Sequence, residues 1–344
     1  MKNDQKPRPG FAYQNLPYRF HAYYKDGEWD SGELVQDSEI KLSEAAVCLH
    51  YGQEIFEGLK AYRSSEGSIN LFRPLLNAER MRDSAERMMM APVPTELFLR
   101  AVQSVVQANQ EWVPPYGKQE TLYLRPLLIG TQAKVGVDPS SEYLFIVFAT
   151  PVGSYYSGDL KPGKYLVSDF DRAAGLGTGA VKTGGNYAAS LYPSHMAKAA
   201  GFSDALFLDP LEHRYIDETT GANFFGITKS GQFLTPKSPS ILPSITKRSI
   251  LVLAEEMGLH PAETKIPIDE IDDFVEAGAM GTAAVISPIG SITYQEKKHI
   301  IGSETTAGPF TQKLRDELIG IQFGDIEDRH NWLTSACASF PKKI

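Results

Sequence analysis

Apolar and polar positions alternate near the start of the chain and later recur at helical spacing. Residues 20–24 alternate aromatic and polar side chains and run into a turn at residues 25–28, which predicts an antiparallel hairpin. Apolar residues then recur every three or four positions over residues 77–90, with Asn77 as the expected N-cap, and again over residues 96–112. We therefore predict strands first and two helices after them.

Two β-rich apolar runs, at residues 121–130 and 143–149, predict buried strands, because the segment between them is rich in turn-forming residues. After Pro151 the composition shifts to glycine, serine, tyrosine and proline, which is typical of a crossover between domains. The prediction is an N-terminal α/β domain over residues 1–152, an interdomain loop over 153–164 and a larger C-terminal domain over 165–344.

The second half of the chain continues with strand-like segments and then helical patterns. We expect strands at residues 165–168, 204–208 and 224–228, and helices at residues 249–257, 268–277 and 310–321. Hairpins with segregated helices favour two α+β-type domains over one doubly wound parallel sheet.

Composition narrows the class of protein without defining a function. With 344 residues, 42% hydrophobic and 22% charged, the chain is an ordinary globular protein with enough length for a deep cleft. Its net charge of −8, with no basic tract, argues against a nucleic-acid partner. Because no apolar run could span a bilayer and residues 1–10 lack an apolar signal region, we expect no membrane partner and a cytoplasmic location.

Cysteine and histidine usage makes a metal enzyme improbable. Cys48 and Cys337 match neither a metal-ligand spacing nor a disulfide framework, and the seven histidines form no paired motif. We therefore predict no metal site.

The densest chemical signal is a glycine-rich stretch, residues 175–187, that contains one lysine and no other charged residue. A phosphate-binding loop needs glycine directly before its lysine, but Val181 precedes Lys182, and the dinucleotide-binding spacing of glycines is absent too. Packing among small apolar residues disfavours an ammonium ion, so the amine becomes a usable nucleophile toward a carbonyl. Schiff-base chemistry fits, and so does an exposed lysine on a flexible loop; the residues alone favour neither.

The segment Val181-Lys-Thr-Gly-Gly-Asn-Tyr187 closely resembles the lysine segment of branched-chain aminotransferases, which are fold-type IV pyridoxal-phosphate enzymes. Further matching segments follow the family's order along nearly the whole chain: residues 50–62, 71–81, 122–126, 218–223 and 281–283. The resemblance implies a two-domain mixed α+β and α/β fold, like that of D-amino-acid aminotransferase, with pyridoxal 5′-phosphate at the domain interface. It also implies a homodimer.

Carried over position by position, the resemblance assigns cofactor roles. Lys182 holds the cofactor as a Schiff base and later moves the substrate proton. Tyr187 contacts the cofactor's phenolic oxygen, and Glu218 contacts the pyridine nitrogen. The phosphate is expected at Arg80, at the backbone amides of Ile245 and Thr246, and at Thr282. The alternatives are a solvated Arg80, a solvated Glu218 and ordinary helix capping by Ser244.

The resemblance also implies the substrates: L-leucine, L-isoleucine or L-valine, and 2-oxoglutarate or L-glutamate, taken in turn by a ping-pong cycle. Aromatic residues would surround the branched side chain, where each buried methylene contributes about 0.8 kcal/mol; they are Tyr51, Phe56 and Tyr155. Polar partners for glutamate are expected at Tyr123 and Arg125, and for the α-carboxylate at the backbone of Thr282 and Ala283. Taken singly, the aromatic residues could equally be packing residues.

Three other functions compete. A D-amino-acid aminotransferase or an aminodeoxychorismate lyase shares the lysine, glutamate and phosphate arginine, but the segments at residues 50–51, 122–126 and 281–283 follow the branched-chain pattern. A non-catalytic cofactor-binding protein would have lost Lys182 or Glu218. The redox cysteine pair of the animal members is replaced here by Ala284 and Ser287, so we predict no thiol switch at that site.

Overall fold

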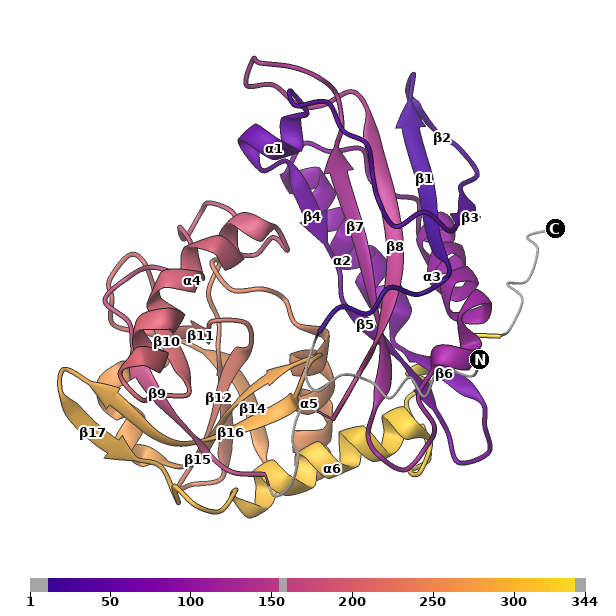
Figure 1. Ribbon diagram of the computed structural model, residues 1–344. Coiled ribbons are helices and arrows are strands. Elements are labelled where there is room, and N and C mark those ends of the chain that lie inside the picture. Colours follow the sequence, from indigo (N-terminus) through magenta and orange to yellow (C-terminus); the bar gives the residue numbers. More distant parts are fainter. Residues whose placement is uncertain (1–11, 155–159, 338–344) are drawn as a thin grey trace. The chain divides into compact units, whose positions relative to one another are not determined.

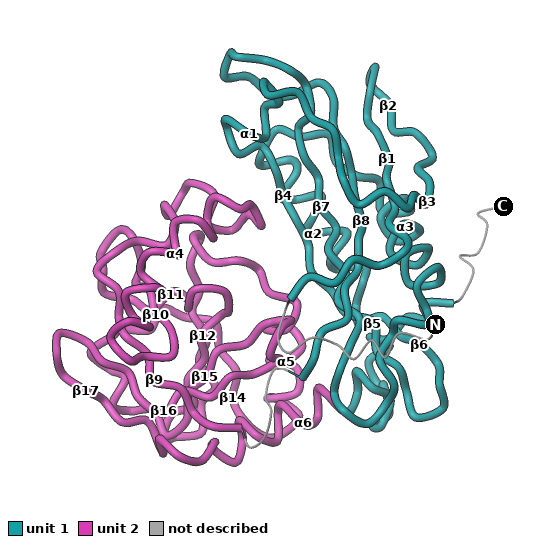
Figure 2. Tube along the Cα trace, viewed as in Figure 1, with its two compact units in different colours: residues 1–155, 320–344 teal, residues 156–319 magenta. Residues whose placement is uncertain are grey.

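The structure is a computed structural model that describes residues 12–154 and 160–337. The chain divides into two compact units, one formed by Met1–Tyr155 together with Gly320–Ile344 and the other by Tyr156–Ile319 (Figure 2). The substrate residue predicted at Tyr155, together with residues 155–159 of the loop predicted over residues 153–164, lies outside the described residues. Each unit has its own sheet and is described separately.

The first unit is built on an antiparallel sheet with the strand order β18-β6-β5-β7-β8-β1-β2, to which β3 adds beside β1 and β4 beside β7. Its strands are β1 (Arg19–Lys25), β2 (Glu28–Trp29), β3 (Glu33–Val35), β4 (Glu54–Phe56), β5 (Leu59–Arg63), β6 (Ile69–Phe72), β7 (Thr121–Gly130), β8 (Tyr143–Val152) and β18 (Leu333–Ser335). The predicted hairpin is present, because Tyr24 pairs with Trp29.

Two helices, α2 (Pro74–Arg87) and α3 (Thr95–Ala108), cover one face of this sheet (Figure 1). Phe98 of α3 stacks on Phe145 of β8, with ring centroids 6.1 Å apart, so the apolar side of the helix completes the core. The short helix α1 (Val47–Tyr51) precedes β4, and a 3₁₀ turn, η1 (Gln110–Trp112), follows α3.

The prediction of Asn77 as the N-cap of α2 is wrong. The helix begins at Pro74, whose fixed φ suits the first helical position, and the preceding Arg73 has a left-handed φ of 49°. Asn77 therefore lies inside the first turns, where it is buried and donates a hydrogen bond to Glu57.

The C-terminal residues return to the first unit. Strand β18 pairs with β6, and Trp332 packs edge-on against Phe72 with ring centroids 5.7 Å apart. Residues 320–344 thus group with the first unit, which differs from the predicted C-terminal domain of residues 165–344. Helix α6 (Pro309–Phe323) contains the boundary between Ile319 and Gly320.

In the described part of the second unit, six strands close into a ring in the order β11-β10-β9-β16-β15-β12, because β12 pairs back to β11. Strands β13 and β14 extend from β12, and β17 pairs with β16. The bounds are β9 (Gly163–Val167), β10 (Asp204–Leu208), β11 (Ile216–Thr219), β12 (Asn223–Thr228), β13 (Gln232–Pro236), β14 (His260–Thr264), β15 (Phe274–Gly281), β16 (Val285–Tyr294) and β17 (Lys297–Ile300).

Alternating residues of β10 show how this unit is packed. Leu206 and Leu208 join one apolar cluster with residues of β9, β12 and β15, whereas Ala205 and Phe207 pack with Ala197 of helix α4 (Gly184–Ala199). Helix α5 (Ile245–Glu256) packs against β14 and β15. Among the described residues no helix is both long and apolar enough to cross a membrane.

The helix predicted over residues 268–277 is wrong. A 3₁₀ turn, η2 (Ile268–Asp273), is followed there by strand β15, which pairs with β12 on one side and β16 on the other. Two partner strands satisfy the backbone of Phe274–Gly281 and override its local helical pattern.

Candidate active site

The glycine-rich stretch ends in helix α4, and Lys182 lies just before the helix starts. Thr183 is the extended N-cap residue and Gly184 the first helical residue. Tyr187 lies on the first turn, and the Nζ atom of half-buried Lys182 donates a hydrogen bond to its Oη atom over 3.0 Å. The five-residue spacing read in the sequence therefore brings these two side chains together.

Asn186 fixes the loop that leads to Lys182. Its Nδ2 atom donates to the carbonyl oxygens of Thr178 (2.6 Å) and Val181 (2.8 Å), and its Oδ1 atom accepts from the Thr178 hydroxyl (2.9 Å). The Asn186 side chain is buried, so these bonds are shielded from competing water. The position of Lys182 is thus set from the first turn of α4.

Gly179 lets this loop approach the segment that leads into α5. A Cβ atom at Gly179 would overlap the carbonyl oxygen of Ser240. No side chain fits there, so glycine is required for contact rather than for an unusual φ.

Glu218 lies on the hairpin formed by β11 and β12, opposite Asn223 in the strand register. The residue is 3% exposed, and the Asn223 Nδ2 atom donates to the Glu218 Oε2 atom over 3.3 Å. Burial raises the pKa of the Glu218 carboxyl to about 7 against the opposing effect of the Arg172 guanidinium, and the neighbouring Asp217 raises it further. The alternative of a solvated loop charge does not apply to this residue.

Arg172 is a site residue that the sequence did not reveal. Its Nη1 atom lies 2.9 Å from the Oε1 atom of Glu218, and both side chains are almost fully buried. The guanidinium carbon also lies 5.9 Å from the ring centroid of Tyr187. One arginine outside any glycine or lysine motif carries no sequence signal of its own, which is why it was missed.

The turn that carries Thr282 and Ala283 lies beside the hairpin of Glu218. It joins β15 to β16, and β15 pairs with β12 through Asn223 and Met280. A Cβ atom at Gly281 would lie 3.5 Å from that of Ala222 in the β11–β12 turn. Both turns are therefore at the same end of the six-strand ring.

The start of α5 is tied to the same hairpin, since the Asn223 Nδ2 atom donates to the Leu242 carbonyl oxygen over 3.2 Å. Ser244 caps the helix by accepting the backbone N–H of Lys247 over 3.1 Å. The N–H groups of Ile245 and Thr246 lie in the first turn, where a helix offers no internal acceptor. Capping by Ser244 and anion binding by these two amides are therefore compatible.

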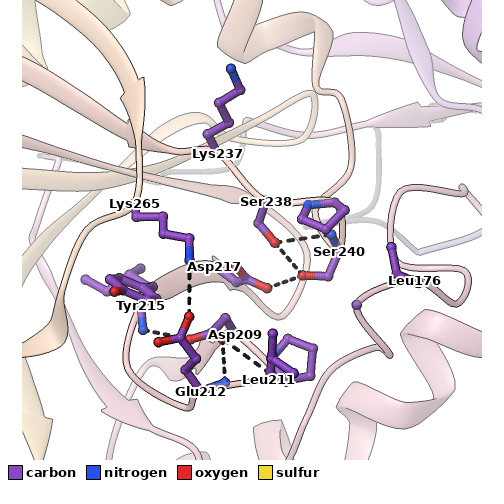
Figure 3. Close-up of a pocket in the computed structure, with 14 residues that line it drawn as sticks. Leu176, Asp209, Leu211, Glu212, Tyr215, Asp217, Lys237, Ser238, Ser240 and Lys265 are labelled. Carbon is purple, nitrogen blue, oxygen red and sulfur yellow. Dashed lines mark hydrogen bonds and ion pairs between the residues drawn. The ribbon is translucent and has the colours of Figure 1, made fainter.

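A separate cavity of about 490 Å³ lies on the Asp217 side of β11 (Figure 3). Asp217 and Glu218 are adjacent in the strand, so their side chains point to opposite faces. The Asp217 carboxylate is directed at Ser240, whose hydroxyl donates a short hydrogen bond to it (Figure 3). This cavity is thus behind the strand and distinct from the Lys182 and Glu218 side chains.

Arg80, in the first unit, is not solvated. It lies on α2 and donates from Nε and Nη2 to the two carboxylate oxygens of Glu57, over 2.6 and 2.8 Å. The Glu57 side chain is fully buried, and Asn77 donates to it as well. Glu57 lies in the matching segment at residues 50–62, but no role was predicted for it, because its partner Arg80 is in a separate segment.

Phe56, Tyr123 and Arg125 form one cluster in the first unit. Strand β4 pairs with β7, and Tyr123 and Arg125 are two residues apart on β7, so they share a face. The guanidinium carbon of Arg125 lies 4.7 Å from the Phe56 ring centroid, and its Nη2 atom donates to the Tyr123 hydroxyl over 3.2 Å. Tyr51, at the end of α1, instead donates its hydroxyl hydrogen bond to the Val135 carbonyl.

The residues of the second unit fit pyridoxal phosphate chemically. The Glu218 Oε1 atom is buried and accepts no hydrogen bond from the described residues, so it has a lone pair for a protonated pyridine nitrogen. Lys182 offers an amine for a carbonyl carbon, and the first turn of α5 offers N–H groups for a phosphate. These three groups, an amine, a buried carboxylate and a helix N-terminus, match the aldehyde, the pyridine nitrogen and the phosphate of that cofactor.

Residues 54–292 match the family described as amino-transferase class IV, so fold and site together define an enzyme of that class. The chain is 55% identical over 330 residues to the branched-chain-amino-acid aminotransferase of Haemophilus influenzae, covering 94% of this chain and 96% of the relative. It is 50% identical over 327 residues to that of Helicobacter pylori, covering 94% and 95%.

A solved structure, a T.th. branched-chain amino acid aminotransferase with pyridoxamine 5′-phosphate, matches with a TM-score of 0.76 at 26% identity. The match covers 96% of this chain and 100% of that chain. The chain belongs to the branched-chain-amino-acid aminotransferase family. The predicted family and mixed α and β fold class are thereby confirmed.

Proposed function

We propose that this protein reversibly transfers the amino group of L-leucine, L-isoleucine or L-valine to 2-oxoglutarate, giving the branched 2-oxo acid and L-glutamate. The observation that carries the proposal is the pairing of Lys182 with Tyr187 in the same unit as a buried carboxylate, Glu218, that accepts no hydrogen bond on Oε1 from the described residues. These are the groups that an aldehyde cofactor with a basic ring nitrogen requires.

The proposed cofactor is pyridoxal 5′-phosphate, which supplies an aldehyde carbon for amines and a ring that withdraws electrons from the substrate α-carbon. Lys182 would hold it covalently, Glu218 would accept the pyridinium N–H, and Tyr187 would contact the phenolic oxygen. Ile245, Thr246 and Thr282 would bind the phosphate, and Arg80 is proposed as a further phosphate ligand. The solved relative described above carries the pyridoxamine form of this group.

Lys182 has a second proposed task once its Nζ atom is released. A free amine at the start of α4 can take the proton from the substrate α-carbon and return it elsewhere, as a general base and then a general acid. The hydrogen bond to Tyr187 keeps the Nζ atom in place between these steps. The rigid loop held by Asn186 limits its travel, which favours a short, directed proton transfer.

For substrate recognition we propose the cluster of Phe56, Tyr123 and Arg125. Phe56 presents an aromatic ring to an aliphatic chain, and the guanidinium of Arg125 suits the distal carboxylate of glutamate. The buried Arg125 Nε atom has no hydrogen-bond partner among the described residues, so a donor is available there. Tyr51, Tyr155 and the backbone of Thr282 and Ala283 complete the proposed substrate contacts.

The decisive experiment follows the visible absorption of the cofactor-loaded protein while L-leucine is added without a keto acid, with D-alanine in parallel. We expect the absorption of the lysine-bound cofactor to disappear with L-leucine alone. A response to D-alanine alone would reassign the protein to a D-specific aminotransferase. No lysine-bound absorption in cofactor-saturated protein would refute the role of Lys182.

We also propose a cytoplasmic homodimer. The homodimer rests on family membership, and light scattering coupled to size-exclusion chromatography tests that part of the proposal directly. A mass near twice 38.0 kDa is expected, and a monomer would contradict it.

A further inference from the structure

Glu218 presents an electrostatic problem that the proposed function does not solve by itself. A carboxyl buried to 3% exposure prefers to be neutral, yet accepting a pyridinium N–H requires the carboxylate form. A neighbouring group that favours the charged form would prepare the site before the cofactor binds.

The groups that face Glu218 come from five parts of the second unit, one of them the Leu242 backbone N–H in the segment before α5. Arg172 follows β9, Lys182 precedes α4, Asp217 is the neighbour on β11, and the Asn223 amide is opposite on β12. The positive groups favour the carboxylate and Asp217 opposes it. Of these, Arg172 is in direct contact, at 2.9 Å, and is itself almost fully buried.

The contact between Arg172 and Glu218 leaves a carboxylate lone pair without a hydrogen bond from the described residues. Although the Nη1 and Oε1 atoms are 2.9 Å apart, neither atom makes a hydrogen bond of good geometry with a described residue. The arginine therefore acts through its charge while the Oε1 lone pair stays available. Arg172 also lies over the ring of Tyr187, so one guanidinium adjoins both the residue assigned to the pyridine nitrogen and the residue assigned to the phenolic oxygen.

We propose that Arg172 is a positioning residue whose buried guanidinium favours the carboxylate form of Glu218 against the effect of burial and holds that side chain in place in the cofactor-free protein, so that the site is prepared for a protonated pyridine ring. This inference rests on the proposed function for the identity of the ligand. The state of Glu218 itself is a property of the chain alone and can be measured without any cofactor.

The first experiment titrates the Glu218 carboxyl in the cofactor-free protein by ¹³C NMR, with carboxyl-labelled glutamate and Glu218→Gln to identify the signal. Arg172→Met is expected to raise the titration midpoint by about one unit or more, the usual effect of removing an adjacent opposite charge. Asp217→Asn is expected to lower it, because a neighbouring negative charge is removed. Opposite shifts from the two variants are the signature of a field effect.

Arg214→Met is the matched control. Arg214 is exposed, and its guanidinium carbon lies 5.7 Å from the ring centroid of Tyr215, an arrangement like that of Arg172 and Tyr187. Arg214 is not among the groups that act on Glu218. Its variant should leave the midpoint unchanged. If Arg172→Met does not fold, Arg172→Lys decides, since a shorter, displaced cation is expected to raise the midpoint by a smaller amount.

The second experiment measures the dissociation constant of pyridoxal phosphate against pH by equilibrium dialysis. Binding should weaken as the pH falls through the Glu218 midpoint, and in Arg172→Met the weakening should begin at higher pH. A Glu218 midpoint unchanged in the arginine variants would overturn the proposal. If the wild-type protein transfers no amino group from L-leucine while the variants still shift the Glu218 midpoint as expected, the proposed function alone is refuted.

Discussion

At the scale of single residues, the site depends on charges that are paired out of contact with water. Glu218 is paired with Arg172 in the second unit, and Glu57 is paired with Arg80 in the first. Such pairs are costly to break, because removing one partner leaves the other buried and uncompensated. Two changes at single residues test how the site uses its titratable groups.

The first prediction concerns Lys182. Replacing it with alanine should lower turnover with L-leucine by about 100- to 10,000-fold, the usual contribution of a positioned acid–base group. The covalent cofactor adduct formed by borohydride in the wild-type protein should also be absent by peptide mass spectrometry. Lys198→Ala, at the exposed far end of α4, is the control and should behave like the wild type. Normal turnover of Lys182→Ala would refute the assignment.

The second prediction concerns the pH dependence of folding. Burial raises the pKa of Glu218 from its ordinary 4.5 to about 7, so between these values the folded chain holds a proton that the unfolded chain has lost. The free energy of unfolding of the cofactor-free protein should therefore decrease as the pH rises from 4.5 through 7. The decrease should reach at most about 3 kcal/mol, at about 1.4 kcal/mol per pKa unit.

Glu218→Gln removes this titration, so its unfolding free energy should be flatter across that pH range in thermal or urea unfolding. Because the variant also leaves Arg172 unpaired, the quantity to compare is the slope with pH and not the absolute stability. An identical slope in both proteins would contradict the raised pKa.

The residues that the sequence could reveal are those with a motif around them. Lys182, Tyr187 and Glu218 lie in segments that match those of the family and follow the same order along the chain. The structure brings Lys182 and Tyr187 within hydrogen-bonding distance. The roles of Arg172 and Glu57 could not be predicted, although Glu57 lies in a matching segment, because each role depends on a partner distant in sequence. Contacts of this kind depend on strand pairing, which the local pattern does not encode.

At the scale of elements, the start of α4 is the structural centre of the site. Its first turn carries Tyr187, and Asn186 from the same turn closes the loop in front of Lys182. The glycine-rich sequence allows this loop to approach Ser240 closely. It also makes α4 difficult to predict, because Gly184 and Gly185 begin the helix and Pro193 lies inside it, and both residue types disfavour helices.

The third prediction tests the loop closure. Asn186→Ala leaves buried carbonyl oxygens without donors and should destabilise the protein by about 1–3 kcal/mol. Asn186→Asp should be worse at pH 8, because a carboxylate faces two carbonyl oxygens, and should improve at lower pH once the carboxyl can donate. Thermal unfolding relative to wild type at both pH values measures this. Equal effects of the two variants at pH 8 would contradict the assigned bonds.

The fourth prediction compares two glycines of the same motif. Gly179→Ala forces a methyl group against the Ser240 carbonyl and should cost about 1–3 kcal/mol. Gly185→Ala meets no atom within 4 Å and lies in the first turn of α4, so it should stabilise by roughly 0.5–1 kcal/mol. Urea unfolding of both variants provides the test. A neutral Gly179→Ala would show that the loop is free to move away.

Element prediction succeeded where the local pattern and the tertiary environment agree. The strands at residues 121–130 and 204–208 have the bounds that their apolar runs predict. Residues 268–277 were predicted as a helix, but Phe274–Gly281 lies between two other strands, and this pairing decides its structure. Helix α4 was missed for the opposite reason, because tertiary contacts stabilise a helix that its own residues disfavour.

At the scale of the whole molecule, the chain builds its first unit from both ends. Strand β18 pairs with β6, and the Trp332 ring packs on Phe72. The Arg73 guanidinium carbon lies 4.9 Å from the centroid of the Trp332 ring. The second unit is by contrast one continuous segment, Tyr156–Ile319. The first unit therefore depends on residues that its own N-terminal segment does not contain.

The fifth prediction follows from that dependence. Trp332→Ala should lower the free energy of unfolding by about 3–5 kcal/mol, the range for removing a buried aromatic side chain. Trp29→Ala, on the half-exposed edge strand β2, is the control and should cost less. Urea unfolding followed by circular dichroism compares them. Equal losses would show that the C-terminal strand adds little to the first unit.

The return of β18 also sets an order of events during synthesis. All of the second unit is synthesised before Leu333–Ser335, so the β6 edge waits for its neighbour through roughly 13–52 s of translation at about 5–20 residues per second. During that interval the nascent chain exposes an unpaired strand edge, since β6 has only β5 as a neighbour, and this edge can add to other chains. Expression conditions that slow elongation should therefore favour aggregation of this protein, and chaperones that shield nascent chains should counter it.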